Sequence, residues 1–499
     1  MNVSQSNRRF LRRVTSWFGS HRLPLLALGC ITAIGAILRA YHLGFKPLWF
    51  DEALFYWIGQ RTLPDAITQN ALVTSAPPLF PLLIWLVSRI STTEVALRFV
   101  PFVAGTLAIP AIYILARRYI SVGGALASSI MIAVAPSQVK FSQQVREYSL
   151  SVLLGLAILA SFGSFLEKRT WRYAIILSLT TIVGIFTHYG LALLVLAVDC
   201  VFLANLLRMK SPRRRLFLKW SVAQFFGFAA ALAVYFLALR QQFHPVVLGG
   251  AGYLQSGFWA GSTLPSAVQF LYDGVRDVMA SAFPGYVFTL MLYTGGMVLL
   301  LRHWRTPYPY IIAAPILAVA GASLLRLYPL TGDRQDLFLT PLIILVAATA
   351  LDYMIRTDDR RLLVAVFLSL MVWRAIHSLQ DYYPTDGDSA VGNLVKRLAD
   401  SAAPGDPIYL CLGDDPALRY YVYSRYPLPL NPIIEGKRGP GPRDYIDQVD
   451  SMLSLYKRAW MIIFPPCGDM TPLLDHVAKD WTIELIEKRY PDAQLFFVH

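Results

Sequence analysis

The sequence predicts an α-helical polytopic membrane protein with about 11 transmembrane helices and a C-terminal α/β domain. Of its 499 residues, 56% are hydrophobic and only 15% are charged, far from the balance of a soluble domain. Apolar stretches of about 20 residues, enough to cross a hydrocarbon core, recur from Pro24 to His377. From Ser378 onward, short apolar runs alternate with Asp, Gly and Pro, as in a folded aqueous domain.

Eleven apolar segments are expected to span the membrane. In chain order they are residues 24–43, 99–116, 123–136, 150–166, 173–187, 191–207, 220–239, 286–301, 310–327, 336–353 and 362–376. One more apolar segment, residues 77–90, is short and opens with two prolines, so we expect a re-entrant or interfacial helix there. Counting it as a span would reverse the orientation of everything after it.

Positive charges orient these spans. Basic residues fall in every second connection, which the positive-inside rule assigns to the cytoplasm. They include Arg117, Arg118, Lys168, Arg169, the run 208–219, Arg302, Arg305, Arg356, Arg360 and Arg361. The N-terminus is then cytoplasmic, and the first apolar stretch is too long for a signal-peptide core, so we expect it to be retained as a span of the inner (plasma) membrane.

This topology divides the chain into three expected parts. A basic cytoplasmic segment at 1–23 precedes a membrane domain at 24–377, whose outer loops include 44–98 and 241–283, and an extracytoplasmic α/β domain occupies 378–499. In that domain, expected helices at 389–402, 416–423, 444–457 and 472–479 alternate with strands at 407–411, 459–464, 481–486 and 495–498. Its Cys411 and Cys467 would share an oxidising compartment, so we expect them to pair.

The net charge of +14 does not indicate nucleic-acid binding. The basic residues lie in short loops between apolar segments, where the positive-inside rule accounts for them. The sequence contains no zinc-finger spacing, no Walker loop and no nucleic-acid motif. Nucleic acid is therefore not an expected partner.

The sharper of two acidic sites at the predicted outer rim is Asp51-Glu52, which follows Trp49 and Phe50. Adjacent carboxylates in apolar surroundings should repel one another and hold a proton or a cation more readily. A general base needs such tuning. The alternative is that Asp51 caps a helix at 52–60 while Glu52 points to water.

Three further outer positions carry candidate residues. Glu147 is the second acidic site, between Arg146 and Tyr148, and its alternative is an interfacial ion pair with an aromatic anchor. His188 ends the fifth expected span, where a lone histidine is more often a hydrogen-bonded structural group. Arg334 precedes the tenth span and suits a bidentate phosphate contact, with helix capping and an ion pair as the alternative.

In order and spacing, these residues resemble the bacterial GT-C glycosyltransferases, including the protein O-mannosyltransferase-like and aminoarabinose-transferase-like groups. The resemblance covers roughly residues 24–353. It rests on Leu48-Trp49-Phe50-Asp51-Glu52, Pro77-Pro78, Arg98, the segment 142–148, Thr187-His188-Tyr189, and Arg334 leading into Pro341.

The resemblance implies a transferase that passes a sugar from a polyprenyl-phosphate donor to an extracytoplasmic lipid, glycan or protein. It implies catalytic roles for Asp51, Glu52 and Glu147, and substrate contacts from Arg146, Tyr148, His188 and Arg334. Some transferases of this fold use a divalent metal and others do not. No metal-specific spacing occurs in the sequence, so metal dependence stays open.

Three other functions would use some of the same features. An oligosaccharide polymerase or ligase that uses a diphosphate-linked glycan would need the same outward acidic and basic groups. A transporter would use the charges as an ion path, but transporters often place charges at mid-membrane within repeated halves, and here they lie at the rim without a repeat. A non-catalytic lipid-binding scaffold is a further alternative. The C-terminal domain either recognises the acceptor, covers the site or stabilises the protein as a cap.

Overall fold

The computed structural model describes the chain except residues 1–2, 210–212, 243–250, 284–285, 303–305, 358–359, 384–390, 437–441, 464–466, 468 and 490–492. Of the expected features, Arg305 and part of the 241–283 loop lie outside the described residues. The chain packs into two compact units. The first comprises Met1–Tyr41, Thr62–Ile84 and Arg98–Asp381, and the second comprises His42–Arg61, Trp85–Leu97 and Tyr382–His499. Parts of the first outer loop thus group with the C-terminal region, whereas the sequence assigned that whole loop to the membrane domain.

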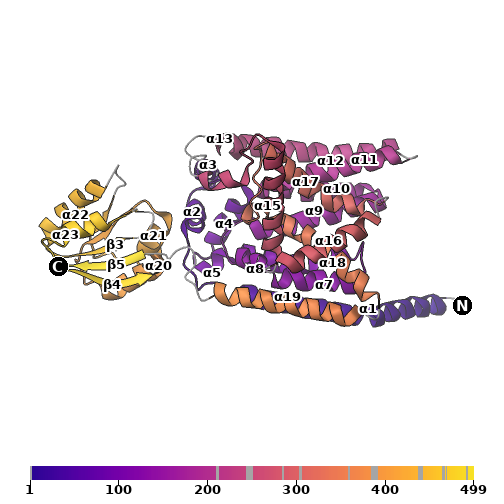
Figure 1. Cartoon of the computed structure of the whole chain (residues 1–499), viewed down its shortest axis with the longest axis horizontal. Helices are drawn as coiled ribbons and strands as arrows, with labels where there is room; N and C mark the ends of the chain where they lie inside the picture. The colour runs from indigo at the N-terminus through magenta and orange to yellow at the C-terminus, as the bar shows by residue number, and fades with distance from the viewer. Residues whose placement is uncertain are drawn as a thin grey trace. The chain divides into compact units, whose positions relative to one another are not determined.

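The first unit is a bundle of mostly apolar helices (Figure 1). Its helices are α1 (Val3–Ala40), α3 (Leu63–Val73), α4 (Leu79–Ser88), α6 (Phe99–Ala116), α7 (Val122–Val134), α8 (Pro136–Ser142), α9 (Tyr148–Lys168), α10 (Trp171–Thr187), α11 (Gly190–Arg208), α12 (Arg213–Val234), η1 (Tyr235–Leu239), α13 (Arg240–Gln242), η2 (Ala251–Gly257), α15 (Leu264–Ala282), α16 (Tyr286–Arg302), α17 (Tyr308–Leu324), η3 (Arg334–Leu339), α18 (Thr340–Ile355) and α19 (Arg361–Tyr382). The last residues of α4 and α19 belong to the second unit.

Each of the eleven expected spans coincides with a helix or with a pair of consecutive helices. Among the described residues, seven helices are long and apolar enough to cross a membrane, or eight if the bent pair α7–α8 is one span. Helices α10, α16 and α17 are apolar but shorter, so a total of eleven crossings stays a prediction. Helix α4, the segment expected not to span, has 10 residues. The chain is a multi-pass membrane protein.

The bend between α7 and α8 has an identifiable cause. The two helices meet at 55°, because Pro136 lacks an N–H and forces Ala135 out of helical backbone, to a ψ of 120°. The break deprives the carbonyls of Ile132 and Ala133 of their usual helical donors. The guanidinium of Arg39 on α1 donates to both, at 3.0 and 2.8 Å. Arg39 is fully buried.

Helix α18 lies in the core of the bundle. Of its apolar window, 78% is buried, and residues 340–348 are buried without interruption, as expected of a helix that is apolar all round. Because η3 leads directly into α18, the loop that carries Arg334 is attached to the most buried of the candidate spans.

The second unit contains a five-stranded sheet with strand order β2-β1-β3-β5-β4 (Figure 1). Its strands are β1 (Ile408–Leu410), β2 (Ile433–Glu435), β3 (Ala459–Ile463), β4 (Ile483–Arg489) and β5 (Ala493–Val498), and its helices are α2 (Phe50–Gly59), α5 (Glu94–Leu97), α20 (Val391–Ser401), α21 (Pro416–Tyr420), η5 (Tyr421–Arg425), α22 (Pro442–Tyr456) and α23 (Thr471–Val477). Strand β1 pairs parallel with β2 and β3, and β5 pairs antiparallel with β3 and β4. The α/β domain and the four strands expected from the sequence are confirmed, and β2 is additional.

A disulfide links the segments that follow the parallel strands β1 and β3. Cys411 follows β1 and pairs with Cys467, which lies in the connection after β3, with 6.1 Å between their Cα atoms. The pairing predicted from the sequence is confirmed. Cys30 and Cys200, in the apolar helices α1 and α11, are free thiols.

Candidate active site

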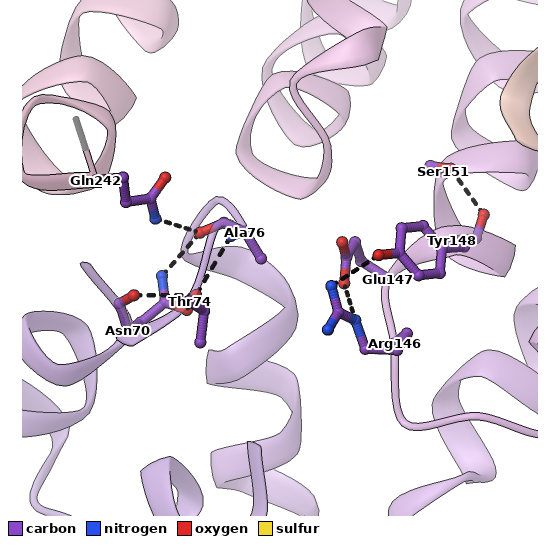
Figure 2. A network of polar contacts seen from close by, with 8 residues as sticks. All are labelled: Asn70, Thr74, Ala76, Arg146, Glu147, Tyr148, Ser151 and Gln242. Carbon is purple, nitrogen blue, oxygen red and sulfur yellow. Dashed lines mark hydrogen bonds and ion pairs between the residues drawn. The ribbon is translucent and has the colours of Figure 1, made fainter. Parts of the chain in front are cut away.

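The first unit buries an ion pair where α9 begins. The side chain of Arg146 is 7% exposed and that of Glu147 is 4% exposed, with 3.4 Å between Arg146 Nε and Glu147 Oε2. Arg146 Nη2 also donates to the Tyr148 hydroxyl at 2.7 Å, and Ser151 Oγ donates to the Tyr148 carbonyl, which fixes the first turn of α9 (Figure 2). Such a pair tolerates burial only while both partners remain, because one alone would be an uncompensated buried charge.

His188 lies against this pair, between the end of α10 and the start of α11. Its ring centroid is 6.0 Å from that of Tyr148, 5.7 Å from Phe338 and 6.4 Å from Tyr328. Burial lowers the pKa of His188 to about 4; the charge of Glu147 opposes this shift and that of Arg146 adds to it. The imidazole is therefore neutral at neutral pH. It can exchange hydrogen bonds with a substrate, but it does not supply the positive charge of a phosphate-binding cation.

The loop before α18 is held by a buried carboxylate. Oδ2 of Asp336 accepts hydrogen bonds from the backbone N–H groups of Thr331 and Gly332, at 2.6 and 2.9 Å. Gly332 has a φ of +69°, where a side chain would be strained. Tyr328 donates to the carbonyl of Gln335 at 2.7 Å. These contacts fix the backbone on both sides of the partly buried Arg334. The expected alternative, a capping side chain, is not seen at Asp333, which makes no side-chain cap bond.

A second polar group fixes the segment before Pro77-Pro78. The carbonyl of Ala76 accepts from Asn70 Nδ2 at 2.9 Å and from Gln242 Nε2 at 3.0 Å (Figure 2). Gln242 in turn accepts from the Tyr189 hydroxyl at 2.6 Å. The pKa of Tyr189 is raised chiefly by burial, and the negative charge of Glu147 raises it further. The residue after His188 therefore links the segment before Pro77-Pro78 to the surroundings of the ion pair.

Sequence reasoning missed Asn70 and Gln242. Both amides are buried, with 0% and 5% exposure, and a buried amide needs specific partners. In the sequence they are ordinary polar residues of an amphipathic helix and of a helix end. The one available signal was their position beside Pro77-Pro78 and at the end of an expected span.

Asp51 and Glu52 lie in the second unit, on the first turn of α2. Asp51 is partly buried, whereas Glu52 is buried, and its Oε2 accepts from the Trp49 N–H at 3.4 Å as in a capping box. The alternative in which Asp51 caps the helix and Glu52 points to water is therefore wrong: Glu52 provides the cap bond. Its carboxylate has a structural task, which leaves Asp51 as the more accessible acid of the two.

Residues from the end of the chain hold α2 in place. The Tyr56 hydroxyl donates to Ser424 Oγ at 2.9 Å, Trp57 Nε1 donates to the Pro416 carbonyl at 3.0 Å, and the Tyr56 ring packs edge-on against Tyr420 with centroids 4.7 Å apart. The helix that carries Asp51 is thus positioned by the C-terminal domain.

The structure brings Arg146, Glu147, Tyr148 and His188 together within the first unit. Arg334 belongs to the same unit, four residues before Phe338, which packs on His188. Among the residues the structure describes, no group of three or more His, Cys, Asp or Glu side chains is arranged to hold a metal ion.

Comparison with known proteins agrees with this architecture. Residues 75–239, which include the Ala76 segment, the ion pair and His188, match the dolichyl-phosphate-mannose-protein mannosyltransferase family. The structure of ArnT from Cupriavidus metallidurans in the apo state superposes with a TM-score of 0.60 at 14% identity, over 94% of this chain and 97% of that one. The chain has the GT-C glycosyltransferase fold. The GT-C fold expected from the sequence is thus confirmed.

Two further solved structures share the GT-C fold. ArnT from Cupriavidus metallidurans bound to undecaprenyl phosphate gives a TM-score of 0.59 at 14% identity, with the same coverage of 94% and 97%. The Archaeoglobus fulgidus oligosaccharyltransferase in the apo form gives 0.52 at 13% identity, over 90% of this chain and 70% of that one. No curated protein matches the chain.

Proposed function

We propose that the chain transfers a sugar from a polyprenyl-phosphate donor to a lipid, glycan or protein acceptor outside the cytoplasm. The GT-C fold supports an enzyme of this class, and one protein with that fold was solved with undecaprenyl phosphate bound. The buried Arg146–Glu147 pair beside a neutral His188 carries the proposal, because charged groups in a membrane protein are costly and are usually retained for function. The basic loops support an extracytoplasmic position for this cluster.

In the proposed reaction, an acceptor hydroxyl attacks the anomeric carbon of the sugar. The bond from that carbon to the carrier phosphate breaks, the phosphate leaves with the electron pair, and the hydroxyl proton passes to a carboxylate. We assign this base to Asp51. Glu52 orients the first turn of α2 through its bond to Trp49.

The carrier phosphate needs positive charge and hydrogen-bond donors as it departs. We assign the charge to Arg334, whose planar guanidinium suits a bidentate phosphate contact, and to Arg146. Tyr148 and His188 then serve as neutral hydrogen-bonding groups. Glu147 keeps Arg146 in position through their ion pair.

Mass spectrometry of the cell envelope from a deletion strain tests this function. The deletion should remove one sugar from a glycolipid, glycan or glycoprotein, and a polyprenyl-phosphate sugar should accumulate because its consumer is absent. Complementation with the wild-type chain should reverse both changes. Accumulation of a diphosphate-linked oligosaccharide would instead identify a polymerase or ligase. Unchanged glycolipids, glycans and glycoproteins would contradict the proposal.

A further inference from the structure

The first unit has a cavity at the end of α9 opposite the buried Arg146–Glu147 pair. It measures about 450 Å³, and its polar lining includes Arg118, Glu167, Tyr308, Asp352 and Arg356. Helix α9 begins at Tyr148, beside the buried ion pair, and reaches this cavity at Glu167 near its last turn. At about 1.5 Å per residue the two ends are roughly 30 Å apart, the thickness of a hydrocarbon core. The cavity and the buried Arg146–Glu147 pair therefore lie at opposite ends of α9.

Arg118 supplies donors at this cavity. Its Nη1 contacts Glu167 at 3.0 Å and its Nη2 donates to Ser164 Oγ, while its Nε is buried and has no hydrogen-bond partner among the described residues. A guanidinium has five N–H donors, so Arg118, whose side chain is 21% exposed, keeps N–H groups beyond those that contact Glu167 and Ser164. Arg356 pairs with Asp352 at 2.9 Å, and its side chain is 61% exposed, so part of its guanidinium faces outward. An incoming anionic oxygen would find donors from both arginines.

An apolar groove adjoins the cavity. It measures about 400 Å³, shares Leu299 and Tyr353 with the cavity wall, and is otherwise lined mainly by apolar residues of α16, α18 and α19. The α16 and α18 ribbons lie side by side (Figure 1). The groove follows α16 from Arg302 back to Met291, roughly 16 Å at 1.5 Å per residue. That length accommodates a large part of an acyl chain.

We propose that this composite site binds one phospholipid with an anionic headgroup, taken from the leaflet at the basic end of the bundle. The headgroup phosphate occupies the cavity and accepts hydrogen bonds from Arg118 and Arg356, while an acyl chain lies in the groove along α16. With Arg302 of the groove, the arginines of the composite site outnumber its carboxylates, Glu167 and Asp352, and basic pockets between helices are suited to anionic lipid headgroups. The polyprenyl-phosphate donor is a poorer fit, because Arg146, proposed to hold its phosphate, lies at the other end of α9. Only this choice of lipid rests on the proposed function, since the site itself rests on the cavity and the groove.

Two variants test the headgroup contact and the acyl-chain contact separately. Arg118→Gln removes the guanidinium, and the partner it leaves, Glu167, is 53% exposed and therefore solvated. Gly295→Leu fills the groove, because a Cβ there would meet only Ala350 Cβ at an ordinary 3.8 Å. Leucine also favours helix over glycine, so the fold should persist. The matched controls are Arg214→Gln on α12 and Gly29→Leu on α1, where a Cβ has open space.

The measurement is native mass spectrometry of the full-length, delipidated protein titrated with phosphatidylglycerol, phosphatidylcholine or undecaprenyl phosphate. The wild type should bind one phosphatidylglycerol more tightly than phosphatidylcholine. Each test variant should weaken that binding roughly tenfold, the loss expected for one hydrogen bond to a charged group or for a blocked chain site. Both controls should bind as the wild type does.

Three results would overturn the proposal. The first is unchanged phosphatidylglycerol binding by Arg118→Gln and Gly295→Leu. The second is equal binding of phosphatidylcholine and phosphatidylglycerol by the wild type. The third is loss of undecaprenyl phosphate binding, rather than phosphatidylglycerol binding, in the two variants, which would make the site a carrier site.

Discussion

At the residue scale, Asp51 and Arg334 have different proposed tasks, so their variants should differ in kind. Asp51→Asn removes a proton acceptor but little volume, so turnover should fall by about 10²–10⁴-fold while donor binding and folding persist. Arg334→Ala removes a charge-assisted phosphate contact and should instead weaken donor binding. The measurement is turnover and donor affinity of the purified protein with its polyprenyl-phosphate sugar, with Asp400→Asn, on the exposed side of α20, as the control for charge loss.

Each half of this prediction can fail separately. If Asp51→Asn keeps wild-type turnover, Asp51 is not the base, and Glu52 and Glu147 are the next candidates. Normal donor binding by Arg334→Ala would leave the charged contact to the phosphate to Arg146, with His188 as a neutral hydrogen-bonding group.

His188 should make stability depend on pH. Its pKa falls from 6.5 to about 4 on folding because of burial, so between these values the unfolded chain binds more protons than the folded one. Stability is therefore lost as the pH falls from 6.5 towards 4, by up to about 1.4 kcal/mol per pH unit. His188→Asn, which does not titrate, should show a shallower decline of the thermal midpoint in detergent. Parallel pH curves for the two proteins would contradict a buried neutral histidine.

At the element scale, the bend at Pro136 and the buried Arg39 should be energetically coupled. Arg39→Met removes the donors to the carbonyls of Ile132 and Ala133, which should cost about 1–3 kcal/mol for each group left unsatisfied. In a Pro136→Ala background, the restored N–H can bond to Ile132 in the ordinary helical way. The same Arg39 substitution should then cost less. Chemical denaturation of the four proteins in a double-mutant cycle measures the difference, and an equal cost in both backgrounds would refute the coupling.

Helices and strands that depend on a local sequence pattern could be predicted from the sequence. Span length, loop charge and the alternation of apolar runs located the helices of the bundle and four of the strands. Strand β2 was missed because three residues in a proline-rich loop carry too little pattern. The roles of Glu52, Asn70 and Gln242 depend on which residues surround them in three dimensions, and no spacing rule encodes burial of a single polar side chain. Glu147, Arg146 and His188 could be marked as candidates because charge or imidazole beside an apolar span is itself unusual, and the structure places them together.

At the scale of the whole molecule, orientation is the property most open to direct test. Reporter fusions at Arg214 and Thr357 should report the cytoplasm, and those at Gln255 and Gly413 the outside, because the basic loops fix the alternation. Gly413 is decisive, since it lies beside the disulfide-bonded Cys411. A cytoplasmic signal there would put that bond in a reducing compartment and remove the extracytoplasmic assignment of the C-terminal domain.

The second unit consists of segments that the ribosome makes at different times. Its first pieces, His42–Arg61 and Trp85–Leu97, are made before residues 98–381, and their partners follow from Tyr382 onward. At about 5–20 residues per second, the ribosome needs on the order of 15–60 s for the intervening stretch. Throughout that delay Tyr56 and Trp57 lack their hydrogen-bond partners, the Ser424 hydroxyl and the Pro416 carbonyl, so the helix bearing Asp51 acquires its final support only after residues 416–424 have been made.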